Sequence, residues 1–265
     1  STPFNEIRAH GAIPFFSWGS ESTPGSPNEP NFQLSDLIAG NHDAYIREFA
    51  TSAKEWGHPF FLRFDWEMNG NWFPWGEEVN GNQLGQFATA WRHVHDIFTE
   101  EGATNVSWVW CPYANRPTNL ASLYPGDKYV DWTCLDAYNW GTNPAAPHGW
   151  RSFENLFYSL YHKVVDTIAP SKPMVIGETA STEYGPDGDP TAGWKAGWIH
   201  NMFELLPTEF PKVRGLIYFE KYGNNMDWPL ESSPSATSSF AAGIKDSRYA
   251  ANSYAGISTS PIPPP

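Results

Sequence analysis

The stretch His58–Gly76, HPFFLRFDWEMNGNWFPWG, joins an apolar run to an abrupt polar and aromatic end. The run 58–65 predicts a β-strand, because short apolar stretches rich in aromatic residues are typical of buried strands. Two carboxylates, an arginine and three tryptophans gather around its end, a mixture that suits neither a core nor a tight turn. We interpret the end of this strand as a candidate active site.

Strand-like and helix-like segments alternate on both sides of this stretch. Apolar runs predict strands at 12–18, 58–65, 105–113, 129–140, 172–181 and 213–222. Apolar residues at helical spacing predict helices at 42–57, 82–102, 150–170, 193–210 and 238–253. This alternation predicts an α/β fold with a parallel sheet covered by helices.

A (β/α)8 TIM barrel and a doubly wound sheet both fit this order. The barrel is favoured because no GxGxxG motif follows an early strand. Polar and aromatic residues also gather at the C-terminal ends of the strands, where barrels build their active sites. These residues are Trp18, Glu67, Tyr113, Tyr138, Glu178 and Glu220. We expect a single barrel over 1–255 and a Ser/Pro-rich tail or linker over 256–265, to which further modules could be attached.

The composition indicates a neutral polymer as the partner. The net charge is −13 without runs of Lys or Arg, which argues against nucleic acid and anionic membranes. The chain has no apolar run of 18 residues, so we expect no membrane span. Aromatic residues make up 16% of the chain, including 14 Trp, and such flat, partly polar rings suit sugar surfaces. We expect a monomer, with Cys111 and Cys134 as buried apolar residues.

Two glutamates at separate strand ends indicate glycosidic cleavage. Glu67 and Glu178 each follow an apolar strand, and the strand ends of a barrel converge. A protonated carboxyl and an ionised carboxylate facing each other are what glycoside hydrolysis needs. Spacing along a strand places Arg63, Asp65 and Glu67 on one face, with Asp65 as a candidate partner of Arg63. Trp72 and Trp75 could form a platform under the sugar.

The segments LRFDWEMNGNWFPWG, SWVWCPY, VDWTCLDAYNW and MVIGETAS resemble glycoside hydrolase family 26 over about residues 12–222. That family contains endo-β-mannanases, mixed-linkage β-glucanases (lichenases) and β-1,3-xylanases. The resemblance implies a retaining (β/α)8 barrel with Glu67 as the acid/base and Glu178 as the nucleophile. It also implies an aromatic residue on the last strand, at Phe219 or Tyr218. The residues that we expect to bind the sugar are Arg63, Trp66, Asn69, Trp72, Tyr113, Tyr138, Trp140 and Phe219.

Two departures from the family pattern are informative. Mannanases of the family usually have His immediately before the acid, and here it is Trp66. An indole N–H donates a hydrogen bond but accepts none, so this change favours a substrate with the glucose configuration. In the family the acid ends the fourth strand, whereas one strand, 12–18, precedes it here. We expect that the first strands of the barrel are missing from this sequence.

The sequence therefore predicts a secreted, retaining endo-β-glycanase without cofactor or metal. The preferred substrate is mixed-linkage β-1,3-1,4-glucan, with β-1,4-mannan second and β-1,3-xylan third. A non-catalytic carbohydrate-binding barrel is the alternative from another class. His93 and His95 lie two apart on a helix and do not face each other, so they are unsuited to share a metal. The motif Asp187-Gly188-Asp189 lacks the remaining ligands of a calcium loop.

Overall fold

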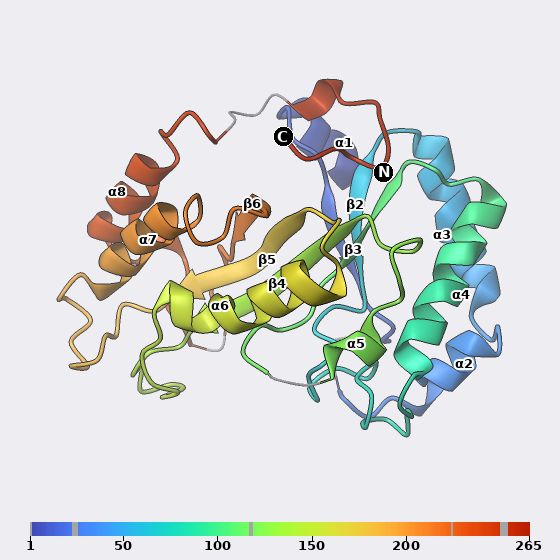
Figure 1. Ribbon diagram of the computed structural model, residues 1–265, viewed down its shortest axis with the longest axis horizontal. Coiled ribbons are helices and arrows are strands. Elements are labelled where there is room, and N and C mark those ends of the chain that lie inside the picture. Colours follow the sequence, from blue (N-terminus) through green and yellow to red (C-terminus); the bar gives the residue numbers. More distant parts are fainter. Residues whose placement is uncertain (1, 23–25, 117–118, 224, 250–253) are drawn as a thin grey trace. The chain divides into compact units, whose positions relative to one another are not determined.

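A computed structural model describes residues 2–22, 26–116, 119–223, 225–249 and 254–265. All six expected strands are present, and each is two to four residues shorter than its predicted range. They are β1 (Phe15–Trp18), β2 (Phe60–Phe64), β3 (Val106–Trp110), β4 (Trp132–Asn139), β5 (Met174–Ser181) and β6 (Val213–Tyr218). They follow one another in a single sheet in chain order (Figure 1). The pairs β1–β2, β2–β3, β3–β4 and β5–β6 are parallel, which confirms the predicted α/β class.

In the part of the chain that the structure describes, five helices follow the strands as the sequence predicted, and three short ones, at 2–9, 34–38 and 120–123, were not predicted. They are α1 (Thr2–Ala9), α2 (Leu34–Ile38), α3 (Asp43–Trp56), α4 (Gln86–Glu101), α5 (Leu120–Leu123), α6 (Phe153–Lys163), α7 (Trp194–Leu205) and α8 (Pro234–Gly243). Short 3-10 turns lie at Pro30–Phe32, Leu230–Ser232 and Tyr254–Gly256, and α6 continues as a π-helical turn over Val164–Ile168. Among the described residues, no helix is both long and apolar enough to cross a bilayer.

The chain forms two compact units. Unit 1 comprises Ser1–Cys134, Ile168–Pro173 and Asn252–Pro265, and unit 2 comprises Leu135–Thr167 and Met174–Ala251. The strand β4 passes from unit 1 into unit 2. The division into one barrel over 1–255 and a tail stays a prediction.

In unit 1, α3 and α4 lie side by side and cover one face of the sheet (Figure 1). Each helix ends at a glycine with positive φ, Gly57 after α3 and Gly102 after α4, as the sequence indicated. The side chain of Phe64 on β2 packs on Trp91 of α4, with 5.7 Å between the ring centroids. Because side chains alternate along a strand, Arg63 points to the opposite face.

The ends of the described chain dock on unit 1. The helix α1, which the sequence reading did not identify, places Phe4 against Phe60, with ring centroids 5.2 Å apart. Near the C-terminus, Ile262 is buried, and its N–H donates to Oγ of Ser107 at 2.8 Å. The carbonyl of Ile262 accepts the indole N–H of Trp132 at 2.8 Å. Part of the expected tail is therefore bound to the starts of β3 and β4.

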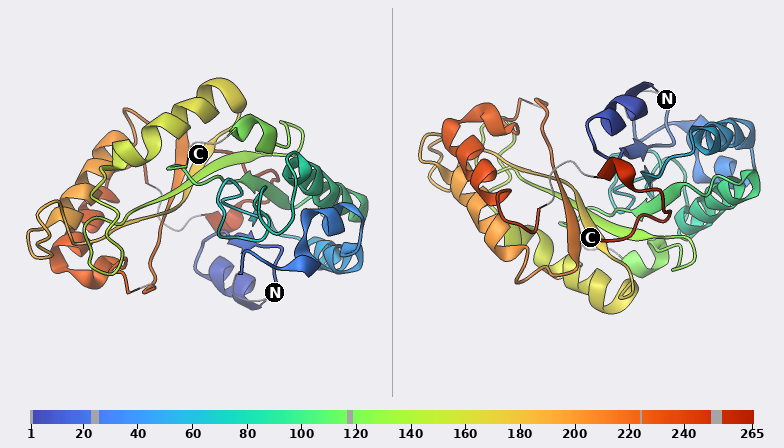
Figure 2. Two further views of the ribbon diagram at one scale, coloured as in Figure 1. Left: turned by 90° about the horizontal axis from the view of Figure 1, so that it is seen from below. Right: turned by 90° about the horizontal axis from the view of Figure 1, so that it is seen from above.

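Unit 2 carries α6, α7 and α8 around β5 and β6. The helices α7 and α8 lie side by side, seen in orange and red in Figure 2. The helix α8 begins four residues before the predicted start because Ser233 caps it, with Oγ accepting the Ala236 N–H at 3.2 Å. Residues 250–253 of the expected helix 238–253 lie outside the described residues.

Candidate active site

The strand β2 ends at Phe64, and the chain then enters a tight turn that carries two carboxylates. Asp65 and Glu67 have φ values of 42° and 53°, a left-handed conformation that residues other than glycine rarely adopt. Neighbouring strands hold the turn, since the Asp65 N–H donates to Trp18 O at 3.0 Å and the Glu67 N–H to Cys111 O at 2.6 Å. Side chains alternate between the two faces only along the strand, and the strand ends before this turn. The expectation that Arg63, Asp65 and Glu67 share a strand face is therefore wrong.

Asp65 bonds to Ser20, and its predicted pairing with Arg63 is also wrong. The backbone N–H of Ser20 donates to Oδ1 of Asp65 at 2.7 Å, and the Ser20 hydroxyl donates to Oδ2 at 2.9 Å. Burial raises the pKa of Asp65 from 3.8 to about 8, although the two bonds from Ser20 act in the opposite direction. Asp65 thus fixes the chain after β1 against the turn that carries Glu67.

Glu67 is buried and is held by a tryptophan from its own loop. The indole N–H of Trp72 donates to Oε2 of Glu67 at 2.6 Å. The loop can close this tightly because Gly70 has no side chain: a Cβ there would lie 2.5 Å from the Trp72 ring. The glycine in the motif therefore lets the Trp72 ring come close enough to donate this hydrogen bond to the candidate acid.

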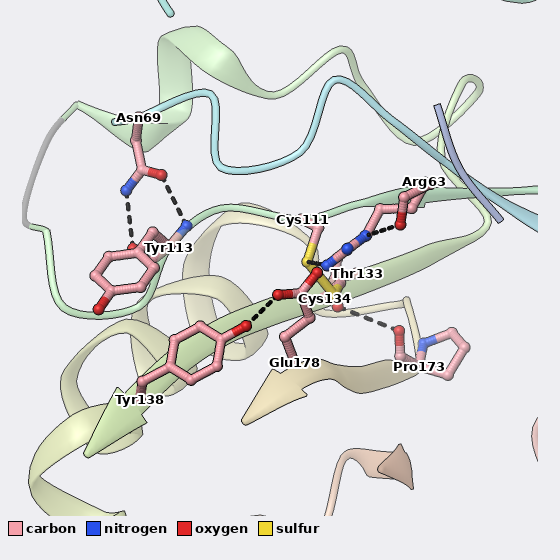
Figure 3. The surroundings of a disulfide bond; sticks show 10 residues. Arg63, Asn69, Cys111, Tyr113, Thr133, Cys134, Tyr138, Pro173 and Glu178 are labelled. Atoms are coloured by element: carbon pink, nitrogen blue, oxygen red, sulfur yellow. Dashed lines mark hydrogen bonds between the residues drawn. A yellow bond between two sulfur atoms is a disulfide. The ribbon is translucent and has the colours of Figure 1, made fainter. Parts of the chain in front are cut away.

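Trp72 is also positioned by the loop after β3. Its half-buried ring packs edge-on against Tyr113, with centroids 5.2 Å apart. Asn69 holds that loop, since its side-chain N–H donates to Tyr113 O at 2.9 Å (Figure 3) and to Arg116 O at 3.1 Å. Oδ1 of Asn69 accepts the Tyr113 N–H at 2.8 Å. Asn69 thus orients Tyr113, and substrate binding by either residue stays a prediction.

Arg63 and Trp66 form a stacked pair next to Glu67. The Arg63 guanidinium lies 5.1 Å from the centre of a Trp66 ring, and its Nε donates to Oγ of Ser17 at 2.9 Å. Trp66 in turn packs on Phe73 and Trp75, with centroids 5.0 and 5.1 Å away. Trp75 is completely buried, so the expectation that it lies under a sugar is wrong. Trp66 and Trp72 keep partial exposure.

Cys111 and Cys134 form a disulfide between β3 and β4 (Figure 3). We expected two separate buried side chains, and the sequence could not show the pairing, since their closeness depends on the register of the two strands. An NH1 group of Arg63 lies 3.9 Å from Sγ of Cys111. Because the carbonyl of Cys111 also accepts the Glu67 N–H, the disulfide braces the turn that carries the candidate acid.

In unit 2, Glu178 lies within β5 and not at its last residue. Between Ile176 and Thr179 the strand β5 advances three residues, while its partner β6 advances two, from Leu216 to Tyr218. The extra residue is a β-bulge, and bulges redirect side chains near active sites. The Tyr138 hydroxyl donates a hydrogen bond to Oε2 of Glu178 (Figure 3).

An aromatic cluster backs Tyr138. Phe219 and Trp228 lie 5.4 and 5.3 Å from the Tyr138 ring, and Trp140 lies 5.0 Å from Trp228. The sequence reading singled out Tyr138, Trp140 and Phe219 but missed Trp228. Trp228 lies in a loop beyond the last strand, and the Asp-Trp-Pro sequence around it was the available signal.

The motifs considered for metals have structural partners. His93 Nε2 lies 2.7 Å from Oδ1 of Asp43, whereas the ring of His95 packs on Trp108 at 5.1 Å. Oδ1 of Asp187 accepts the Asp189 N–H at 3.0 Å, and Oδ1 of Asp189 accepts the Thr191 N–H at 2.7 Å. These aspartates close their own surface loop.

Comparison with known proteins identifies relatives of this arrangement. The family model described as glycosyl hydrolase family 26 matches residues 8–176. Endoglucanase H of Acetivibrio thermocellus is 34% identical over 92% of this chain and 26% of its own length. A mannan endo-1,4-beta-mannosidase of Bacillus subtilis is 29% identical over 76% of this chain and 53% of its own. The chain thus spans about a quarter and about half of these two relatives.

Solved structures show the same fold. The structure of a Cellulomonas fimi endo-beta-1,4-mannanase double mutant has a TM-score of 0.68 with 18% identity. The match covers 94% of this chain and 58% of that one. At this identity the likeness concerns the fold.

Proposed function

Because this chain belongs to glycosyl hydrolase family 26, we propose that it is a retaining endo-β-glycanase with Glu178 as nucleophile and Glu67 as acid/base. The supporting observation is that each carboxyl group accepts a hydrogen bond from an aromatic side chain. Trp72 donates to Glu67 at 2.6 Å, and Tyr138 donates to Glu178. Such a donor restricts the orientation of the carboxyl group, and a catalytic acid or nucleophile must be oriented toward the reacting atoms.

The reaction has two displacements. In the first, Oε of Glu178 attacks the anomeric carbon, the glycosidic bond breaks, and Glu67 gives its proton to the leaving oxygen. In the second, Glu67 takes a proton from water, and the water oxygen displaces Glu178 from the anomeric carbon. The two inversions at one carbon give net retention. All proton transfers and bond changes use these two side chains and water, so no cofactor is required.

Two glutamate variants test the roles. With an activated aryl β-glycoside, Glu178→Ala should lose turnover, and added azide should restore release of the aryl alcohol with an α-glycosyl azide as product. Glu67→Ala should instead give a β-glycosyl azide, because azide then attacks the glycosyl-enzyme in place of water. A Glu178→Ala variant that still cleaves polysaccharide at the parent rate would exclude the nucleophile role. A parent chain that binds polysaccharide but cleaves none of the glycans would instead favour the non-catalytic carbohydrate-binding alternative.

We propose mixed-linkage β-1,3-1,4-glucan as the substrate. Trp66 supports this choice, since its indole donates but does not accept hydrogen bonds beside the acid. The relative with 34% identity bears the name endoglucanase, which also agrees. The alternative substrate is β-1,4-mannan, and the similarity to proteins named as mannanases favours it. The third candidate substrate is β-1,3-xylan. Sizing the products from lichenan, barley glucan, galactomannan and β-1,3-xylan decides among them, and cleavage of mannan alone would reverse the choice.

We also propose that the six strands belong to a (β/α)8 barrel. Membership of the family and the similarity in fold to the solved mannanase structure, with a TM-score of 0.68, support it. We expect a secreted monomer acting on polysaccharide, with further modules attached through the C-terminal tail. Export of the full-length protein, and light scattering of the purified chain, test these two expectations.

A further inference from the structure

Lys195 is a fully buried cation that the proposed reaction does not use directly. It lies in the first turn of α7, and its side chain is 0% exposed. Nζ donates to three consecutive carbonyls, those of Asp227 at 2.6 Å, Trp228 at 2.9 Å and Pro229 at 2.6 Å. Oγ of Ser232 lies 2.8 Å from Nζ as a fourth acceptor, so the three N–H groups are shared among four oxygens. A buried ammonium is costly unless it is paired, so a leucine or methionine would suit the core better.

Carboxylates around this ammonium offset its burial. Burial lowers the pKa of Lys195 to about 8, and the carboxylates of Glu183, Asp227, Glu220 and Glu231 act in the opposite direction. Lys195 is therefore charged at neutral pH and below. A charged Nζ attracts several carbonyl oxygens to one point, which an apolar side chain of the same length cannot do. The loop 227–232 is shaped around this charge.

The loop held by Lys195 is also tied to the residues that follow β5. Oδ1 of Asp227 accepts the Thr182 hydroxyl at 2.6 Å, and Oδ2 accepts the Glu183 N–H at 2.8 Å. The hydroxyl of Ser232 donates to Oε1 of Glu183 at 2.5 Å. Both ends of the loop are therefore bound to the segment that directly follows β5, the strand that carries Glu178.

Trp228 connects this loop to Glu178. Its side chain is 2% exposed and lies in the cluster that includes Tyr138. The Trp228 ring contacts Tyr138, with 5.3 Å between the centroids, and the Tyr138 hydroxyl donates to Glu178. If the carbonyls of 227–229 lost their common donor, Trp228 would be free to shift and Tyr138 with it.

We propose that Lys195 is a positioning residue for glycoside hydrolysis: it holds the loop 227–232 so that Trp228 packs against Tyr138, which donates a hydrogen bond to Glu178. This inference rests on the proposed role of Glu178 as nucleophile. Lys195 acts at the first displacement, because the orientation of the attacking oxygen matters most there. Displacing a reacting group by about 1 Å can cost about 100-fold in rate.

The test compares Lys195→Met with the exposed control Lys245→Met. An activated 2-deoxy-2-fluoro glycoside traps the first intermediate, and peptide mapping identifies the labelled residue. We expect Lys195→Met to lower the rate constant of labelling and kcat by about 10- to 100-fold, with KM changed less than threefold. Lys195→Arg should recover part of this loss, and Lys245→Met should match the parent.

A double-mutant cycle with Tyr138→Phe separates positioning from general loosening of the fold. If Lys195 acts through Tyr138, the double variant should label no more slowly than the slower single variant. The inference would be overturned if the fold-losses in labelling rate of the two single variants multiplied in the double variant. An unchanged labelling rate in Lys195→Met would also overturn it. If circular dichroism shows that Lys195→Met is unfolded, Trp228→Leu replaces it in the double-mutant cycle, and the expected result is the same. A parent that is not labelled at Glu178 would instead contradict the proposed function.

Discussion

The indole N–H of Trp72 donates a 2.6 Å hydrogen bond to Oε2 of Glu67, five residues earlier in the same loop. The bond closes a turn that begins with two left-handed residues, Asp65 and Glu67. The same tryptophan packs on Tyr113 from the next strand end, so it joins the candidate acid to a neighbouring loop. One aromatic side chain thus serves as both a donor to the carboxylate and a wall of the site.

Trp72→Phe should lower kcat/KM by about tenfold or more. The variant keeps an aromatic ring but leaves a buried carboxylate oxygen without its donor, which costs about 1–3 kcal/mol. Steady-state kinetics on the best glycan measures it. Trp56→Phe is the matched control, because it removes an indole donor to Asn5 on α1, away from Glu67. Equal kinetics for the two variants would show that the Trp72 bond has no role in turnover.

Gly70→Ala should reduce activity more than stability. The new Cβ would lie 2.5 Å from the Trp72 ring, so the ring must move and the bond to Glu67 must lengthen or break. Gly197→Ala is the control, since its Cβ meets nothing within 4 Å and helix interiors favour alanine by about 0.5–1 kcal/mol. We expect at least a tenfold loss of kcat for the first variant and none for the second. Full activity in Gly70→Ala would mean that the ring position is unimportant.

Asp65 should make stability depend on pH between about 4 and 8. Burial raises its folded-state pKa from 3.8 to about 8, so the folded state binds more protons in this range. The stabilisation is complete below pH 4 and is lost as pH rises through about 8, at a rate of about 1.4 kcal/mol per pH unit at most. Asp65→Asn should keep the bond from the Ser20 N–H and flatten this slope.

Urea unfolding of the parent and Asp65→Asn at pH 4.5, 6 and 8 measures the difference. As the pH rises, the free energy of unfolding of Asp65→Asn should increase relative to that of the parent. A constant gap across the three pH values would show that Asp65 does not titrate with folding in this range.

Reduction of the disulfide should destabilise unit 1 and reduce activity. The bond joins Cys111 and Cys134, which are 23 residues apart in the sequence, and such bonds contribute about 2–4 kcal/mol. Activity should fall as well, because the Cys111 carbonyl holds the Glu67 N–H. Thermal melts and rates with and without dithiothreitol measure both effects. The double variant Cys111→Ala/Cys134→Ala should be insensitive to the reductant. If dithiothreitol still lowers its stability or activity, the effect of the reductant does not come from this disulfide.

Trp66→His should shift the preference from glucan toward mannan. Imidazole can accept a hydrogen bond where indole cannot, which is the difference that the substrate proposal depends on. The ratio of kcat/KM for galactomannan over barley glucan should rise by about tenfold, the effect of one good hydrogen bond of about 1.4 kcal/mol. Because Trp66 stacks under Arg63, a melt must confirm that the variant is folded. A fall in this ratio would show that Trp66 does not favour glucan over mannan.

The sequence by itself determined the strand and helix order, because apolar periodicity and glycine stops are local signals. It also pointed to Glu67, Glu178 and Tyr138, since a family motif names residues without needing coordinates. The tertiary structure decided their partners. Ser20 bonds to Asp65 from 45 residues away, Cys111 meets Cys134 through strand register, and Trp228 reaches Tyr138 from a loop beyond β6. Such contacts depend on how strands pair and loops close. Packing and desolvation over the whole fold decide both, so the contacts cannot be recognised from the spacing of residues in the sequence.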